Sequence, residues 1–157
     1  RRGAGEGGGP LPPPPAAVEL EGPRVELDDL AALAAAQDPT DPHALLKACC
    51  VALGVVPRGA GAGPGSLSRH LRAAYGAGIE VAAVSALPEG SGLGSSSILA
   101  MVAVAALHRL LRTRAPAPGP EPTPDQLIYR TLLVEQILTT GGGWQDQCGA
   151  FGGFRLA

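Results

Sequence analysis

The sequence predicts a domain that mixes helices with strands, and three patterns indicate this. Residues 24–27 alternate polar and apolar side chains, as an edge strand does. Residues 79–87 form a mostly apolar run that ends before Pro88, which is typical of a strand inside a covered sheet. Residues 96–114 are apolar nearly all round in their first half, so we expect a helix whose first half is buried.

The N-terminal part of the chain has a different composition. Residues 1–23 are dominated by glycine and proline, with prolines in a row at 12–15. Such a tract cannot bury enough apolar surface to offset the entropy lost on ordering. We expect a disordered arm over residues 1–23, serving as a linker or as a ligand for a proline-binding module, and one partial domain over residues 24–157.

Two helices should follow the first strand. They are expected over residues 28–36 and 42–51, and the second has proline at its first position. Residues 54–65 are rich in glycine and proline and should form a loop. The pattern of residues 66–75 is compatible with a short helix or with the approach to a strand.

A last helix should follow the helix at 96–114. A proline-rich linker at 115–122 separates the two. Thr123 has the character of a capping residue, with proline next to it and glutamine three positions on. We expect this helix to run from Thr123 to about Thr140, where a triple glycine ends it.

Composition excludes several classes of protein. The net charge is −2 over 157 residues and there is no long basic stripe, so nucleic acid is not expected as a partner. The three cysteines have no metal-ligand spacing, and their odd number argues against a disulfide framework, as in a reducing cytoplasm. The apolar run at 98–107 is far shorter than the ~20 residues of a membrane span. We therefore expect a cytoplasmic protein with neither signal peptide nor membrane contact.

The segment at residues 87–100 is the most informative in the chain. Three glycines within five positions precede three serines and an apolar run. Glycine lets a backbone approach a ligand closely, and the first turn of the following helix offers unpaired N–H groups and partial positive charge. A phosphate-binding loop is predicted, although the lysine of a Walker A loop is missing after Gly94. Its residues are Gly90, Ser91, Gly92, Leu93, Gly94, Ser95, Ser96 and Ser97.

Two carboxylates are candidates for chemistry. Asp146 lies just after the triple glycine, where it could orient or deprotonate a hydroxyl during phosphoryl transfer, or simply cap the turn. Glu135 lies among apolar residues of the last predicted helix. It could bind Mg²⁺ together with a serine of the glycine loop, or lie on a solvated helix face.

These motifs together resemble the GHMP kinases. Residues 88–96 read Pro-Glu-Gly-Ser-Gly-Leu-Gly-Ser-Ser and match the second motif of that family, Pro-x-x-x-Gly-Leu-Gly-Ser-Ser. Residues 134–147 and 87–100 are most similar to its fucokinase branch, and the likeness extends over about residues 18–149. The resemblance implies an α+β fold of the ribosomal protein S5 domain 2 type. It is incomplete here, since the family's N-terminal and C-terminal motifs are missing and we expect them to be required.

The resemblance also implies a function. It implies an ATP-dependent sugar kinase that transfers the γ-phosphoryl group to the anomeric hydroxyl of L-fucose. By position in the motifs, Ser96 and Glu135 would hold Mg²⁺ and Asp146 would be the catalytic residue. Residues expected near the sugar are Gly143, Trp144 and Gln147.

Two alternatives stay open. The segment at 149–154 is similar to the heptose-phosphate kinases, a sister branch, so a heptose phosphate or another sugar is a possible substrate. The missing family motifs leave room for a truncated, catalytically inactive fragment that only binds nucleotide.

Overall fold

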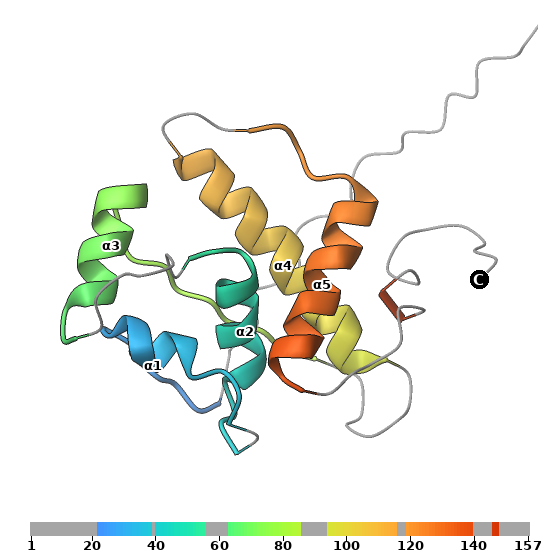
Figure 1. The fold of residues 1–157 in the computed structure, drawn as a ribbon, viewed down its shortest axis with the longest axis horizontal. Helices are drawn as coiled ribbons and strands as arrows, with labels where there is room; N and C mark the ends of the chain where they lie inside the picture. The colour runs from blue at the N-terminus through green and yellow to red at the C-terminus, as the bar shows by residue number, and fades with distance from the viewer. Residues whose placement is uncertain are drawn as a thin grey trace, which may run out of the picture.

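The computed structural model describes residues 22–38, 40–55, 63–85, 94–115, 119–139 and 146–147. Its helices are α1 (Leu30–Ala34), α2 (Ala44–Ala52), α3 (Ser66–Tyr75), α4 (Ser95–Arg114) and α5 (Pro124–Ile137). The two long helices, α4 and α5, lie beside each other, and α2 packs against both (Figure 1). Helices α1 and α3 lie on the far side of α2 from α5.

The helices confirm most of the sequence expectations. All four predicted helices form, and the undecided segment at 66–75 is helical as α3. Helix α1 is shorter than the expected range of 28–36, because the Asp29 side chain accepts a hydrogen bond from the Ala31 N–H and so marks the N-terminal cap. The expected arm at 1–23 lies outside the described residues, apart from Gly22 and Pro23.

The expected strands are not found. Residues 24–27 and 79–85 run as coil, and the described part of the chain contains no strand. A strand exists only where its N–H and C=O groups pair with a neighbouring strand, and these two segments have no such ladder within the described ranges. The family expectation of an α+β fold is therefore not confirmed here.

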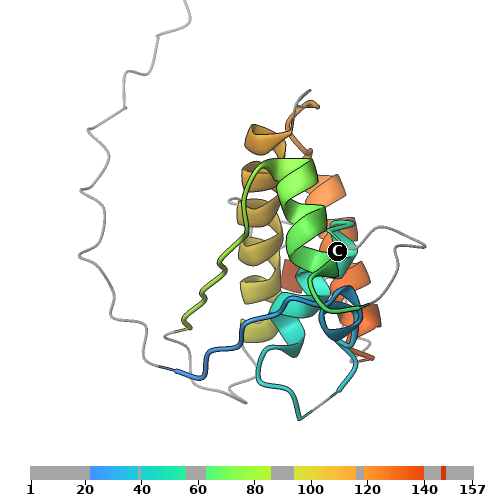
Figure 2. The same cartoon turned by 90° about the vertical axis from the view of Figure 1, so that its left-hand side faces the viewer.

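Helix α4 forms the centre of the core, but only along one face. Its buried residues fall on one stripe that repeats from turn to turn at spacings of three and four: Ser97, Ala100, Met101, Ala103, Val104, Leu107 and Leu111. Val102, on another side, is 58% exposed, so the prediction that the whole first half would be buried is wrong for that side. There, residues 80–84 run along the helix and line a groove of about 400 Å³ with it (Figure 2).

Helices α4 and α5 run antiparallel. Ser97 contacts Glu135 near the start of α4, and one turn further along α4 the Met101 sulfur lies 3.5 Å from the Thr131 hydroxyl. Advancing one turn on α4 therefore moves one turn back on α5. The start of α4 lies beside the end of α5 (Figure 1).

Helix α4 is 20 residues long, and by length and composition it could cross a membrane. The core helix of a globular domain meets the same criterion. In this structure, α4 buries its apolar stripe against α2 and α5, so it acts as a core helix.

Candidate functional site

The candidate site begins at the first turn of α4. Gly94 has a φ of +67°, in the left-handed region that favours glycine, and Ser95 begins the helix. As the cap residue, Gly94 has no side chain to bond the N–H groups of the first turn. The start of α4 therefore keeps hydrogen-bonding capacity and partial positive charge for another group.

Asp146 lies against this helix start. A Cβ built on Gly94 would come 2.8 Å from the Asp146 Cγ and 3.0 Å from its Oδ2. The carboxylate thus occupies the space that a side chain at Gly94 would need. Two motifs far apart in the sequence, the glycine loop and the segment after the triple glycine, meet at this point.

Glu135 lies on the buried face of α5, and its carboxylate is hydrogen-bonded there. The Ser97 hydroxyl and the Gln147 side-chain amide each donate to Glu135 Oε1, over 2.5 Å in both cases. Only 6% of Glu135 is exposed. A buried carboxylate is tolerated when donors replace its lost hydration, and these two side chains do so.

The two contacts join into one cluster. Gly94 and Ser97 belong to the same helical turn, whereas Asp146 and Gln147 are consecutive in the chain. The carboxylates of Asp146 and Glu135 are therefore both held around the first turn of α4. The partial positive charge of a helix N-terminus stabilises negative charge at this place.

The three serines at the start of α4 have different surroundings in the structure. Ser95 is half-buried and Ser96 is exposed, whereas Ser97 is buried and its hydroxyl donates to Glu135. Gln147, expected near the sugar, is fully buried within the cluster and donates a hydrogen bond to Glu135. The remaining predicted site residues lie outside the described residues: Gly90, Ser91, Gly92, Leu93, Gly143 and Trp144.

Sequence reasoning missed the partners of Glu135. A signal for Ser97 was present, because Ser97, Met101 and Val104 share the helical spacing of the buried stripe, and Ser96 does not. No such signal exists for Gln147. Its burial depends on how the chain returns after α5, which local periodicity does not determine.

The donor set fits a magnesium ion. Carboxylate and hydroxyl oxygens are the ligands that Mg²⁺ prefers, and Glu135 lies next to the serines of α4. Within the described ranges, no group of three or more histidine, cysteine, aspartate or glutamate side chains could hold a metal ion. A site with few protein ligands suits Mg²⁺, which usually completes its shell with water and substrate phosphates.

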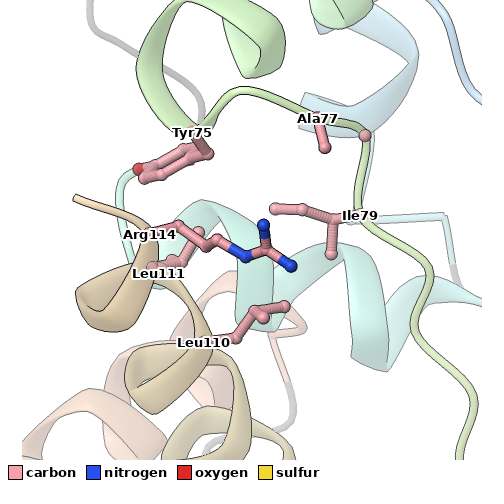
Figure 3. Close-up of a pocket in the computed structure, with 7 residues that line it drawn as sticks. Tyr75, Ala77, Ile79, Leu110, Leu111 and Arg114 are labelled. Carbon is pink, nitrogen blue, oxygen red and sulfur yellow. The ribbon is translucent and has the colours of Figure 1, made fainter. Parts of the chain in front are cut away.

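A small cavity lies at the other end of α4. It has a volume of about 50 Å³ and is lined in part by Tyr75, Ile79 and Arg114, with the Arg114 guanidinium among these side chains (Figure 3). At 1.5 Å per residue, α4 separates this cavity from Gly94 by about 30 Å. The cavity therefore takes no part in the candidate site.

Two cysteines lie in the core. Burial raises the pKa of Cys49 to about 12 and that of Cys50 to about 11, so both remain protonated thiols at neutral pH. Both therefore act as small apolar residues of the core. Cys148 lies outside the described residues.

Comparison with known proteins identifies relatives. The family described as GHMP kinases N terminal domain matches residues 65–153. The L-fucokinase/L-fucose-1-P guanylyltransferase of Bacteroides fragilis is 41% identical over 108 residues, which is 69% of this chain and 10% of that protein. The bifunctional fucokinase/GDP-fucose pyrophosphorylase of Arabidopsis thaliana is 43% identical over 63 residues, 40% of this chain and 5% of that protein. No solved structure matches the chain.

The family match covers the elements that build the site. It includes α3, α4 and α5 and extends through Gly94, Glu135 and Asp146. The chain spans about a tenth or less of the length of these two curated relatives. The matched region is more than half of the chain, and the resemblance inferred from the glycine motif is confirmed. This protein belongs to the GHMP kinase family.

Proposed function

We propose that this chain forms part of the phosphoryl-transfer site of a cytoplasmic sugar kinase. The enzyme would transfer the γ-phosphoryl group of ATP to the anomeric hydroxyl of L-fucose, giving β-L-fucose 1-phosphate and ADP. The supporting observation is the position of the Asp146 carboxylate against Gly94, at the uncapped start of α4. The choice of sugar is supported by two relatives that are named as fucokinases.

The phosphates of ATP would bind at the start of α4. Residues 90–97 would supply backbone N–H groups, and the helix dipole would favour the negative charge of the phosphates. A glycine at position 94 keeps that approach free of a side chain. The same glycine leaves room for Asp146, so the phosphate site and the carboxylate adjoin each other.

Glu135 and Ser96 are the proposed ligands of Mg²⁺. The Ser96 side chain is exposed at the first turn of α4, and the next residue, Ser97, donates a hydrogen bond to Glu135. When bound, Mg²⁺ would neutralise charge on the transferring phosphates. The two donors to Glu135 among the described residues, Ser97 and Gln147, are both neutral.

Asp146 is the proposed catalytic residue. It would accept a hydrogen bond from the sugar hydroxyl and take its proton as the oxygen attacks the γ-phosphorus, while ADP leaves on the opposite side. Most of the rate gain in phosphoryl transfer comes from positioning, so a carboxylate fixed against the phosphate site suits this role. Gly143 and Trp144 are proposed to flank the sugar.

An assay of ADP release tests this proposal. The full-length gene product would be incubated with Mg²⁺ and ATP and with L-fucose, D-galactose or a heptose 7-phosphate, with Asp146→Asn as the control variant. We expect release with L-fucose that the variant abolishes. ADP release only with the heptose phosphate would instead identify a heptose-phosphate kinase. No ADP release with any of the sugars would contradict the kinase proposal.

The same assay on residues 1–157 alone addresses the remaining alternative. If the full-length product turns over and this segment alone does not, the segment needs parts of the kinase that lie elsewhere. If residues 1–157 alone bind ATP but do not turn it over, the segment acts as a nucleotide-binding fragment.

A further inference from the structure

One carboxylate oxygen in the site receives hydrogen bonds from two separate elements. Ser97 on α4 and Gln147, which follows Asp146, both donate to Glu135 Oε1 over 2.5 Å. All three side chains are buried, with exposed fractions of 6% for Ser97, 6% for Glu135 and 0% for Gln147. This arrangement fixes the Glu135 side chain from two directions.

We propose that Gln147, with Ser97, is a positioning residue that sets the orientation of the Glu135 carboxylate and couples it to Asp146. The inference rests on the proposed function, because it assigns a role within the same site. It differs from the expectation that Gln147 contacts the sugar, and it is supported by the complete burial of Gln147 and its hydrogen bond to Glu135.

The chemistry of the donors supports a positioning role. A carboxylate only accepts hydrogen bonds, so the amide NH₂ of Gln147 must face Glu135, and its orientation is determined. Ser97 and Gln147 are both neutral, so neither of these two donors cancels the negative charge of the carboxylate. An arginine or lysine in the same place would neutralise Glu135 and weaken its attraction for a cation. Hydrogen bonds of this kind orient metal ligands in many proteins.

Asp146 is connected to this arrangement in two ways: by its peptide bond to Gln147 and by its close approach to Gly94. Gln147 is the next residue in the chain, so anchoring its side chain on Glu135 restrains the backbone of Asp146. The Asp146 carboxylate in turn lies against Gly94, three residues before Ser97 in the first turn of α4. Gly94, Ser97, Glu135, Gln147 and Asp146 therefore form a closed ring of contacts, and loosening one side of it should affect the other.

The positioning role and a sugar-binding role predict different measurements. If Gln147 acts through Glu135, its loss should weaken the part of ATP binding that depends on Mg²⁺ and lower kcat, with the KM for the sugar unchanged. If Gln147 contacts the sugar, the KM for the sugar should rise and Mg²⁺-dependent binding should stay the same.

The test compares two variants with a matched control in the full-length gene product. Gln147→Met has a similar volume and no donor, and Ser97→Ala removes the other donor while favouring the helix. Gln136→Ala, at an exposed position of α5, is the control. The dissociation constant of ATP would be measured by calorimetry with saturating Mg²⁺ and with EDTA, and thermal unfolding without ligand would verify folding.

In the wild type, Mg²⁺ should increase the affinity for ATP. We expect this increase to be about 10- to 100-fold smaller in Gln147→Met, and the reduction to be less in Ser97→Ala. Gln136→Ala should match the wild type. In a Glu135→Ala background, Gln147→Met should cause no further loss, because its effect passes through Glu135. Should Gln147→Met not fold, Ser97→Ala applies the same test.

An unchanged Mg²⁺-dependent affinity in Gln147→Met, or a loss that persists undiminished in the Glu135→Ala background, would overturn the positioning role. A wild type that binds ATP with Mg²⁺ but phosphorylates no sugar would contradict the proposed function, and the calorimetric comparison would still decide the role of Gln147. A wild type with no Mg²⁺-dependent ATP binding would overturn both.

Discussion

Helices α4 and α5 lie side by side in the core, yet they begin in opposite ways. Helix α5 begins with a complete capping box. The Thr123 hydroxyl accepts a hydrogen bond from the Gln126 N–H over 3.3 Å, and the Gln126 side-chain oxygen accepts one from the Thr123 N–H over 3.0 Å. Helix α4 begins at Gly94, which has no side chain with which to cap it. The N-terminus of α5 is thus capped by side chains of its own sequence. The N-terminus of α4 has no side-chain cap, and we refer to it as the open start of α4.

The difference shows how one element serves stability and the other function. A capped helix has little capacity left at its N-terminus for another group. An uncapped start costs some stability but offers N–H groups and partial positive charge to a phosphate. The carboxylates of Asp146 and Glu135 gather at the open start. Variants at the two starts should therefore affect different quantities.

Asp146→Asn should have the greatest consequence of any single change at the open start. The amide keeps the shape of the carboxylate but cannot accept the proton of the acceptor hydroxyl. We expect kcat to fall by about 10³-fold, with the dissociation constant of ATP unchanged. Steady-state kinetics and ATP calorimetry measure the two quantities. Equal rates for variant and wild type would refute the assignment of Asp146.

Gly94→Val should weaken nucleotide binding. A β-branched side chain disfavours the positive φ at this position and would collide with Asp146, whose Cγ lies 2.8 Å from a Cβ built there. Strain of about 1–3 kcal/mol corresponds to a loss of about 5- to 150-fold in ATP affinity if it falls on the binding site. An unaltered ATP dissociation constant would contradict the phosphate-loop interpretation.

Thr123→Ala should affect stability alone. Removing the capping hydroxyl of α5 should lower the free energy of unfolding by about 1 kcal/mol. Urea denaturation measures this loss, and ATP affinity and kcat serve as internal controls that should not change. A drop in ATP affinity comparable to that of Gly94→Val would remove the functional distinction between the two helix starts.

A smaller, pH-dependent effect is expected at His108, well along α4 from its open start. Burial lowers the pKa of His108 below its ordinary value of 6.5, and Arg130 adds to this effect. The unfolded chain then binds the proton more readily, so the stability from a neutral His108 is present above about pH 6.5 and is lost as the pH falls below it. The fall in melting temperature between about pH 7.5 and about pH 5.5 should be smaller for His108→Gln than for the wild type. An identical fall in melting temperature for the variant and the wild type would contradict the lowered pKa of His108.

The elements with local signals were predictable from the sequence. Thr123, Pro124 and Gln126 specify the start of α5 by themselves, and the structure has the whole capping box there. The apolar spacing of α4 likewise indicated a buried helix. The glycine motif pointed to the site, because Gly94 combines a positive φ with a close approach that only a residue without a side chain permits.

The parts that depend on distant contacts were not predictable in the same way. Residues 79–85 have the composition of a strand, but a strand also needs a neighbour, and none pairs with them among the residues described. Gln147 is polar and next to a candidate catalytic residue, which favoured a role at the sugar. Its burial against Glu135 follows from the return of the chain to α5, which has no local signature.

Two glycines allow a matched test of the open helix start. Gly65 and Gly94 both precede a serine, both act as N-terminal cap residues and have φ values of +72° and +67°. A Cβ on Gly65 would meet only Asp28 Oδ2 at 3.7 Å, so alanine there adds backbone strain without a collision. The backbone strain should be similar at both positions, about 1–2 kcal/mol.

The measurement is the dissociation constant of ATP with Mg²⁺ for Gly94→Ala and Gly65→Ala in the full-length gene product. If the start of α4 binds the phosphates, Gly94→Ala should lose about tenfold or more in affinity and Gly65→Ala should bind like the wild type. Equal affinities for the two variants would contradict a phosphate site at the start of α4.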